Sequence, residues 1–375
     1  MAILTVFYRD DLGMSMTEIM LVQGGFGLAM ALFEFPSGYL ADRIGYRRTM
    51  MIAALMNAIG YSIYARADGI GGVIAGEVVL GVGLALISGS DAALLYESLK
   101  ETGRELDYSK WNGRVRFWGQ LGEGSAALVA GLMFAYWARL PFVVEVGVWV
   151  VNLYVAWRLV EPERHRPVLG ENWRQIKAIV NHVVRGEPKL RAVMLLTIVL
   201  GMSSFIPVWT IQLYATDAGM DAGWLGVVWA AANYSVALSS LFATRVSERI
   251  GFDRLMILCI ALIAIAYAGM GLLQSLWGVA FYFVLTTMRG LFSPPLSHEE
   301  QRLIPSADRA GFLSMRSLVF RLSFLIIGPT VGVAMDQHGQ HQVLLVVGAI
   351  LIVVASLVLL NLRRTFAPDA EESSG

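Results

Sequence analysis

Long apolar runs separated by short polar turns recur along the whole chain. A run of about 20 residues is long enough to cross a bilayer as an α-helix. Helix is the expected conformation, because a lone strand in hydrocarbon leaves its backbone polar groups without partners. The eleven runs lie near Ile19–Tyr39, Thr49–Ala65, Ile70–Ser90, Phe117–Trp137, Leu140–Val160, Ala192–Tyr214, Leu225–Val246, Leu255–Leu273, Leu276–Phe292, Leu318–Met335 and Val343–Leu362. The pattern predicts an all-α membrane protein.

Composition agrees with this prediction. Of 375 residues, 56% are hydrophobic and 15% are charged, whereas soluble domains average about 45–50% apolar and about 25% charged. The 29 basic and 29 acidic residues cancel, which argues against a nucleic-acid partner bound through bulk positive charge. The single cysteine, Cys259, excludes an intrachain disulfide and a cysteine-rich metal site. We expect no cofactor.

Basic residues set the expected orientation. Of the 29 lysines and arginines, 24 fall on one side of the expected spans, and only Arg9, Arg66 and Arg139 fall on the other. The basic side is therefore expected to be cytoplasmic, and the C-terminus to lie there too. The sequence predicts a multi-pass protein of the plasma membrane, which for a bacterium is the inner membrane.

A repeat appears when the sequence is shifted by 206 positions. Tyr8, Asp11, Gly13 and Met14 then fall on Tyr214, Asp217, Gly219 and Met220, and the segment 42–46 falls on 248–252. Parallel duplication of a multi-span half is one plan of secondary transporters, which place the substrate site between the halves. The alternative is chance likeness of helical hairpins, but polar residues and glycines carry the match.

The repeat predicts the domain organisation. We expect an N-terminal bundle (1–160), a cytoplasmic linker with an amphipathic helix (161–191), a C-terminal bundle (192–364) and a disordered cytoplasmic tail (365–375). The counterpart of the span Ala192–Tyr214 would begin before Met1, so the first helix is expected to be largely missing. Either the start is assigned too late or the chain is truncated. With that helix restored, each half has six spans.

The segment Gly38–Arg48 reads GYLADRIGYRR. It resembles the signature loop of the major facilitator superfamily (MFS), with Tyr46 at a position where the family usually has arginine. The segments Glu34–Gly38 and Ser90–Lys100 resemble a largely uncharacterised bacterial group of that family. The resemblance implies the MFS fold, two pseudo-symmetric six-helix bundles.

The resemblance also implies a gating role for this loop. Asp42 is expected to sit at the positive end of the eleventh helix, near Ser317. The expected gating residues, with the degenerate second copy, are Gly38, Asp42, Arg43, Gly45, Arg47, Glu248, Arg249, Gly251 and Arg254. The alternative is that the arginines only enforce topology, which leaves Asp42 and the glycines unexplained.

Charges inside spans are the candidates for coupling. An ionised side chain at the bilayer centre costs about 2.5–3.5 kcal/mol on insertion scales. The candidates are Glu77, Glu123, Arg289 and Glu34. The resemblance puts helices four and ten across the cavity, so Glu77 is expected to face Arg289. Three alternatives remain open for Glu77: an ion pair with Arg289 that breaks during transport, a permanent ion pair, and a carboxyl kept neutral by burial.

Four side chains in or near expected cavity-lining helices are candidates for substrate contact: Trp209, Gln212, Asn233 and Gln120. Packing or interhelical hydrogen bonding explains such residues equally well. No G-x-x-x-x-G-K-[ST] loop is present and no His/Asp/Glu group has catalytic or metal-binding spacing, so we expect neither ATP hydrolysis nor an enzyme.

The sequence as a whole favours a monomeric secondary transporter that works by alternating access. A small-molecule substrate, protons and membrane lipids are its expected partners. Proton coupling is expected because titratable carboxyls lie within spans, and efflux is slightly favoured because the expected cavity is apolar and aromatic. The alternative is a transporter-like sensor or assembly protein without transport activity.

Overall fold

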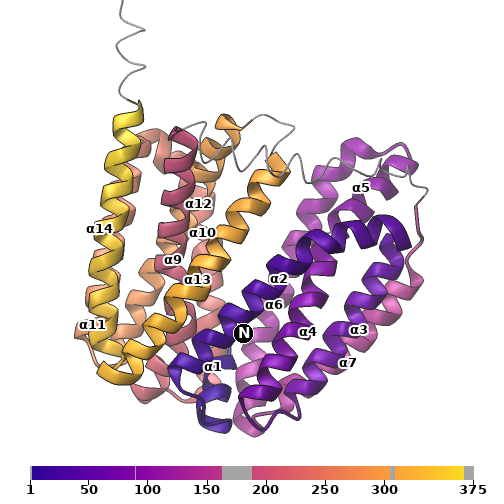
Figure 1. The fold of residues 1–375 in the computed structure, drawn as a ribbon, viewed down its shortest axis with the longest axis horizontal. Coiled ribbons are helices and arrows are strands. Elements are labelled where there is room, and N and C mark those ends of the chain that lie inside the picture. The colour runs from indigo at the N-terminus through magenta and orange to yellow at the C-terminus, as the bar shows by residue number, and fades with distance from the viewer. Residues whose placement is uncertain (1, 89, 163–187, 305–308, 367–375) are drawn as a thin grey trace, which may run out of the picture. The chain divides into compact units, whose positions relative to one another are not determined.

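The computed structural model describes residues 2–88, 90–162, 188–304 and 309–366, and these contain helices and no strands. The first part holds α1 (Leu4–Val6), the π-helix η1 (Phe7–Asp11), α2 (Met16–Ile44), α3 (Tyr46–Tyr64), α4 (Ile70–Ser88), α5 (Asp91–Glu101), η2 (Glu105–Asp107), α6 (Tyr108–Tyr136) and α7 (Leu140–Arg158). The second part holds α9 (Pro188–Asp217), η4 (Ala222–Trp224), α10 (Leu225–Ile250), α11 (Phe252–Leu272), α12 (Trp277–Leu303), α13 (Arg309–His338) and α14 (Gln340–Phe366) (Figure 1).

The helices form two compact units. The first unit comprises Met1–Leu169 with the short segments Ala222–Val227 and Arg321–Gly332, and the second comprises the rest of the chain. Each unit is a bundle of long helices whose polar backbone is satisfied within each helix, as hydrocarbon requires.

Local signals in the sequence explain the ends of α2. The helix begins with a capping box, in which the Glu18 N–H donates to Ser15 Oγ (3.3 Å) and the Ser15 N–H donates to the Glu18 carboxylate (2.8 Å). It ends at Gly45, whose φ of 108° is a conformation that side chains rarely adopt. Gly45 therefore permits the tight turn into α3.

Glycines let α3 and α4 pack closely. A Cβ placed on Gly60 would lie 2.7 Å from the Leu80 side chain, and one on Gly83 would lie 2.4 Å from Asn57 Nδ2. Small residues at helix contacts are the main route to tight packing in lipid, where no hydrophobic force acts between helices. The α3–α4 pair is thus fixed by its glycines.

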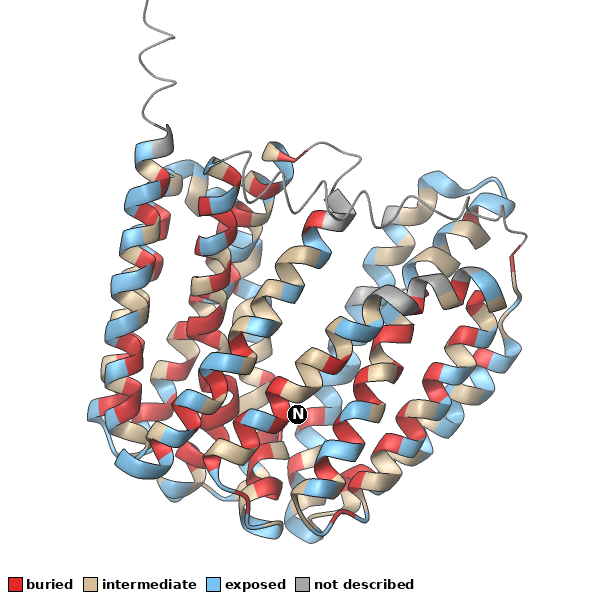
Figure 2. Ribbon diagram, in the orientation of Figure 1, coloured by how far each residue is buried: buried red, intermediate tan, exposed pale blue. Residues whose placement is uncertain are grey.

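The second unit is built around α9. This helix packs against α12, α14 and α11, and its residues are largely buried in Figure 2. Glycines again bring the neighbouring helices close: a Cβ on Gly348 would lie 2.4 Å from Tyr267, and one on Gly271 would lie 2.4 Å from Leu345.

Local structure follows the repeat seen in the sequence. Gly45 and Gly251 both have positive φ (108° and 86°), and each begins a helix, α3 and α11. Gly13 and Gly219 form a second matched pair, with φ of 67° and 92°. Since these positions are 206 residues apart, the two units use the same turns at corresponding places.

All eleven expected spans fall on helices. Among the described residues, eight helices are long and apolar enough to cross a membrane. The separate helix α5 and the π-helix η1 were not predicted. The expected amphipathic linker helix, and all but the first two residues of the tail, lie outside the described residues.

Candidate functional site

A hydrogen-bonded cluster surrounds Glu77 inside the first unit. The Tyr8 hydroxyl donates to Glu77 Oε1 (2.9 Å), and Gln23 Nε2 donates to the same oxygen (2.7 Å). The Tyr8 and Tyr64 hydroxyls are bonded to each other, and Tyr64 is also a hydrogen-bond partner of Glu77. These four residues, hereafter the Glu77 cluster, come from η1, α2, α3 and α4.

The Glu77 cluster is closed to solvent. Glu77 is 5% exposed, and the other three side chains are 3% exposed or less. Tyr64 reaches the cluster because its ring lies against Gly76, where an added Cβ would be 2.8 Å from the ring. Tyr8 enters from the π-helix η1, and π-helical turns occur frequently at functional sites.

Arg139 ties together the chain segments beside this cluster. It contacts Asp11 (Nε–Oδ2 3.5 Å) and Asp68 (Nη2–Oδ1 3.3 Å) and donates to the Ala65 carbonyl (3.2 Å). Asp11 ends η1, while Ala65 and Asp68 follow α3. The segments carrying Tyr8 and Tyr64 are therefore held together at their expected outer ends.

A second buried glutamate has a different set of partners. Glu300, fully buried near the end of α12, accepts a hydrogen bond from Thr197 Oγ1 of α9 (2.9 Å) and pairs with Arg316 of α13. It lies beyond the expected span Leu276–Phe292. Burial raises the pKa of the Glu300 carboxyl, and Arg316 and Thr197 oppose that rise. This ion pair ties three helices of the second unit.

The expected gating loop lies at the junction of α2 and α3. Its Tyr46 and Arg47 N–H groups donate to the two carboxylate oxygens of Glu161 (2.9 and 2.7 Å). A carboxylate at a helix N-terminus satisfies unpaired N–H groups and the helix dipole. Sequence reasoning did not identify Glu161, which is 115 positions from Tyr46.

The other residues that were expected to gate lie at the ends of α2 and α10 and at the start of α11. Gly38 and Asp42 lie in α2, but their side chains are outside the described set, so the contact of Asp42 with the eleventh helix stays a prediction. Arg43 is exposed at the end of α2. In the second copy, Glu248, Arg249, Gly251 and Arg254 are exposed around the turn from α10 to α11.

The charged candidates do not gather at one place within a unit. Glu77 is buried in the first unit, while Arg289 is exposed on α12 in the second. Their pairing stays a prediction, since they belong to different units. Glu123 is exposed on α6, and Glu34 is half-buried on α2.

The substrate-contact candidates also differ in their surroundings. Trp209 and Gln212 are buried in α9, and Trp209 Nε1 has no hydrogen-bond partner among the described atoms. Asn233 donates to the Trp229 carbonyl of its own helix (2.9 Å). Gln120 is exposed on α6. Contact of these four side chains with a substrate stays a prediction.

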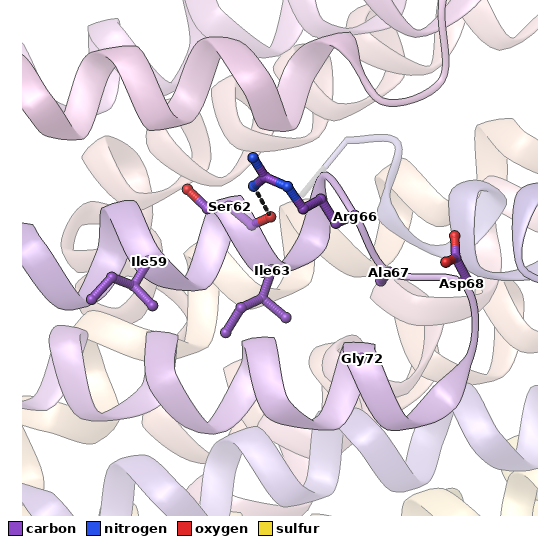
Figure 3. Close-up of a pocket in the computed structure, with 7 residues that line it drawn as sticks. All are labelled: Ile59, Ser62, Ile63, Arg66, Ala67, Asp68 and Gly72. Atoms are coloured by element: carbon purple, nitrogen blue, oxygen red, sulfur yellow. Dashed lines mark hydrogen bonds between the residues drawn. The ribbon is translucent and has the colours of Figure 1, made fainter.

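A hollow of about 400 Å³ lies at the ends of α3 and α4 (Figure 3). Ile59 and Ile63 line its apolar part, and Asp68 and Arg66 stand at its polar part. The Arg66 guanidinium donates to the Ser62 carbonyl (Nη1–O 3.2 Å). Among the described residues, no group of His, Cys, Asp or Glu is arranged to hold a metal ion.

Solved structures of two membrane transporters share the fold of this chain. A point mutant of the nucleoside transporter NupG matches with a TM-score of 0.81 at 13% identity, over 97% of this chain and 94% of that one. A bacterial homologue of the human lysosomal transporter Spinster, in an inward-facing and unoccupied conformation, matches with a TM-score of 0.75 at 14% identity, over 98% and 94%.

The sequence model of the Major Facilitator Superfamily matches residues 1–306. The chain belongs to this family, as the loop Gly38–Arg48 predicted. An uncharacterised MFS-type transporter of Burkholderia mallei (strain SAVP1) is 26% identical, over 92% of this chain and 83% of the relative. The inner membrane transport protein YajR of Escherichia coli (strain K12) is 33% identical over 102 residues, 27% of this chain and 22% of that protein.

Proposed function

We propose that this protein is a secondary active transporter that exports a small solute from a bacterium in exchange for protons, by alternating access. Membership in the MFS and the fold support transport. The observation that carries proton coupling is the Glu77 carboxyl, which is buried in the first unit and whose hydrogen-bond partners in the described structure are uncharged. Ionisable groups inside membrane bundles commonly mark proton pathways.

The solute that fits best is an amphipathic compound of low charge. Trp209 is an aromatic side chain, buried in this structure, with one N–H donor that has no partner among the described atoms. Ligand sites are typically apolar and aromatic, with a few polar groups that fix orientation. We place the solute near Trp209, with Gln212 as its neighbour on α9.

The second part of the proposal concerns the conformational change, which we assign to the loop between α2 and α3. Gly45 makes the turn between α2 and α3, and Glu161 fixes the first N–H groups of α3. A loop held at one end in this way is suited to carry Asp42 and Arg43 as a unit. We propose that these side chains favour closure at the cytoplasmic side.

The hollow in Figure 3 supports a membrane-lipid partner. Its lining includes the apolar residues Ile59 and Ile63 and the cationic residue Arg66. This combination suits a phospholipid, with acyl chain on the isoleucines and phosphate on the arginine. We place this end of α3 at the outer leaflet of the bacterial inner membrane.

The transport proposal is tested in inside-out membrane vesicles that carry a respiration-driven pH gradient and a fluorescent pH-gradient dye. A panel of amphipathic compounds is added one at a time. At least one compound is expected to release protons from vesicles containing the wild-type protein. Vesicles containing Glu77→Gln and vesicles from an empty-vector strain are expected to hold their gradient.

A transporter-like sensor would give a different result. No compound in the panel would change the gradient, whereas a bound ligand would raise the melting temperature of the purified protein. Solute movement that is equal with and without the pH gradient would instead contradict proton coupling.

A further inference from the structure

The two buried glutamates differ in what their partners can do. Arg316, the partner of Glu300, can only donate hydrogen bonds and keeps its charge. The partners of Glu77 include two tyrosine hydroxyls, and each of these can donate or accept. Glu300 is therefore held in one ionic arrangement, while the surroundings of Glu77 can adapt.

The Glu77 cluster satisfies the carboxyl in both protonation states. As a carboxylate, Glu77 accepts from Tyr8 and Gln23 at Oε1 and has Tyr64 as a further partner. As an acid protonated at Oε2, it keeps both bonds at Oε1 and donates to the Tyr64 oxygen, while Tyr64 donates to Tyr8. The acid hydroxyl then donates to Tyr64, the Tyr64 hydroxyl donates to Tyr8, and the Tyr8 hydroxyl donates to Oε1 while it also accepts from Gln23 Nε2 (3.3 Å).

The internal repeat does not carry this cluster in its second copy. At a shift of 206, Tyr8 falls on Tyr214, but Gln23, Tyr64 and Glu77 fall on the uncharged residues Trp229, Met270 and Phe283. Tyr214 donates instead to the carbonyl of Leu273. The tyrosine is thus shared by both halves, whereas its carboxyl partner belongs to the first half alone.

We propose that Tyr8 and Tyr64 position Glu77 as a single-proton binding site and relay its proton, a role that rests on the proposed proton-coupled transport. A hydronium ion donates a proton to the Tyr64 oxygen as Tyr64 passes its own proton to the Glu77 carboxylate. Tyr64 stays neutral, the carboxylate becomes a carboxylic acid, and the hydronium ion becomes a water molecule. Release follows the same bonds in reverse.

The ion pairs of Arg139 lie next to this proton path. Arg139 joins Asp11, three residues after Tyr8, to Asp68, four residues after Tyr64. Water reaches the Tyr64 hydroxyl when these segments separate. Among the residues that the structure describes, the further titratable groups near the cluster are Tyr61 on α3 and, beyond it, Glu145 on α7.

Infrared difference spectroscopy of the purified protein in liposomes tests this site without a solute. On acidification, the wild-type protein is expected to gain a carboxylic-acid C=O band that Glu77→Gln loses and Glu300→Gln keeps. Tyr8→Phe removes a donor to Oε1, so its band is expected at higher frequency. Tyr64→Phe is expected to keep the band but form it more slowly after a pH jump.

Tyr61→Phe is the matched control, because Tyr61 lies on the same helix near the cluster but is not one of its four members. It is expected to leave the frequency and the rate of the band unchanged. The proposal is overturned by a full band in Glu77→Gln, by wild-type kinetics in Tyr64→Phe, or by a band that depends on sodium concentration instead of pH.

The two proposals fail separately. If the infrared band behaves as expected but no compound moves protons in the vesicle assay, the proton site is supported and the proposed transport function is contradicted. If Glu77→Gln still carries out proton-coupled transport and the wild-type protein gives no acid band from Glu77, the proton site is contradicted and the proposed transport function is supported.

Discussion

At the scale of single residues, the missing side chain of Gly76 decides where the Tyr64 hydroxyl lies. A Cβ at this position would come within 2.8–2.9 Å of the Tyr64 ring carbons, whereas a Cβ on Gly71 of the same helix would meet nothing within 4 Å. The ring is enclosed among buried neighbours and has little room to move. The two glycines therefore form a matched pair for mutation.

Gly76→Ala is expected to destabilise the protein by about 1–3 kcal/mol, the usual cost of overpacking. It is also expected to slow the formation of the Glu77 acid band after a pH jump, because the Tyr64 hydroxyl is displaced. Thermal unfolding in detergent and the infrared difference spectrum measure the two effects. Gly71→Ala is expected to change neither, and equal behaviour of the two variants would contradict the role of Gly76.

Sequence reasoning identified Glu77 but not its partners. A glutamate within an apolar run is conspicuous, since charged side chains are costly there. Tyr8, Gln23 and Tyr64 are not conspicuous, because tyrosine and glutamine are ordinary residues in helices. Gln23 and Tyr8 are also far from Glu77 in the sequence, by 54 and 69 positions. Comparing the two halves at the shift of 206 would have shown that Glu77 of the first half corresponds to the apolar Phe283 of the second.

At the scale of helices, the start of α3 depends on a carboxylate supplied by a distant segment. Gly45 at the N-cap has no side chain to accept from the free N–H groups, and Glu161 accepts from two of them. This contact joins the gating loop to the segment that follows α7. The α3 helix is thus anchored at its N-terminus by a residue beyond the bundle's last helix.

Glu161→Ala is expected to lower the stability of the first unit by about 0.5–2 kcal/mol, the range for loss of an N-cap. Glu161→Gln, which keeps an acceptor oxygen but loses the charge, is expected to retain part of that stability. Unfolding in detergent monitored by circular dichroism measures both. Glu101→Ala removes an exposed carboxylate at the end of α5 and is expected to be neutral; a similar loss there would contradict the capping role.

The helices themselves were predictable because each span must be apolar and about 20 residues long. The break between α4 and α5 was missed because the chain continues in helix-forming residues after Gly89 and Ser90. The π-helix η1 was missed because a single wide turn has no periodic signal. The Glu300–Arg316 pair was missed because both residues lie outside the apolar runs.

At the scale of the whole molecule, the parallel repeat makes a prediction about topology. Asp68 and Gln274 lie 206 positions apart, in the turns after α3 and α11, and both are exposed. A parallel repeat puts them on the same side of the membrane, and the arginine distribution makes that side the outer one. An inverted repeat would put them on opposite sides.

Single cysteines test this arrangement with little background, since the native Cys259 is buried. A membrane-impermeant maleimide added to intact cells is expected to label Asp68→Cys and Gln274→Cys. Glu101→Cys, on the expected cytoplasmic side, is expected to react only after the cells are permeabilised. Labelling of one turn but not the other in intact cells would contradict the parallel repeat.

The confinement of the Glu77 cluster to the first unit has an evolutionary consequence. The second unit keeps the matching tyrosine, Tyr214, but has Met270 and Phe283 where the first has Tyr64 and Glu77. The carboxyl is thus a feature of one half of the repeat alone. If the proposed proton coupling at Glu77 holds, we expect related sequences that move different solutes to vary mainly in the second half and to keep Tyr8, Tyr64 and Glu77.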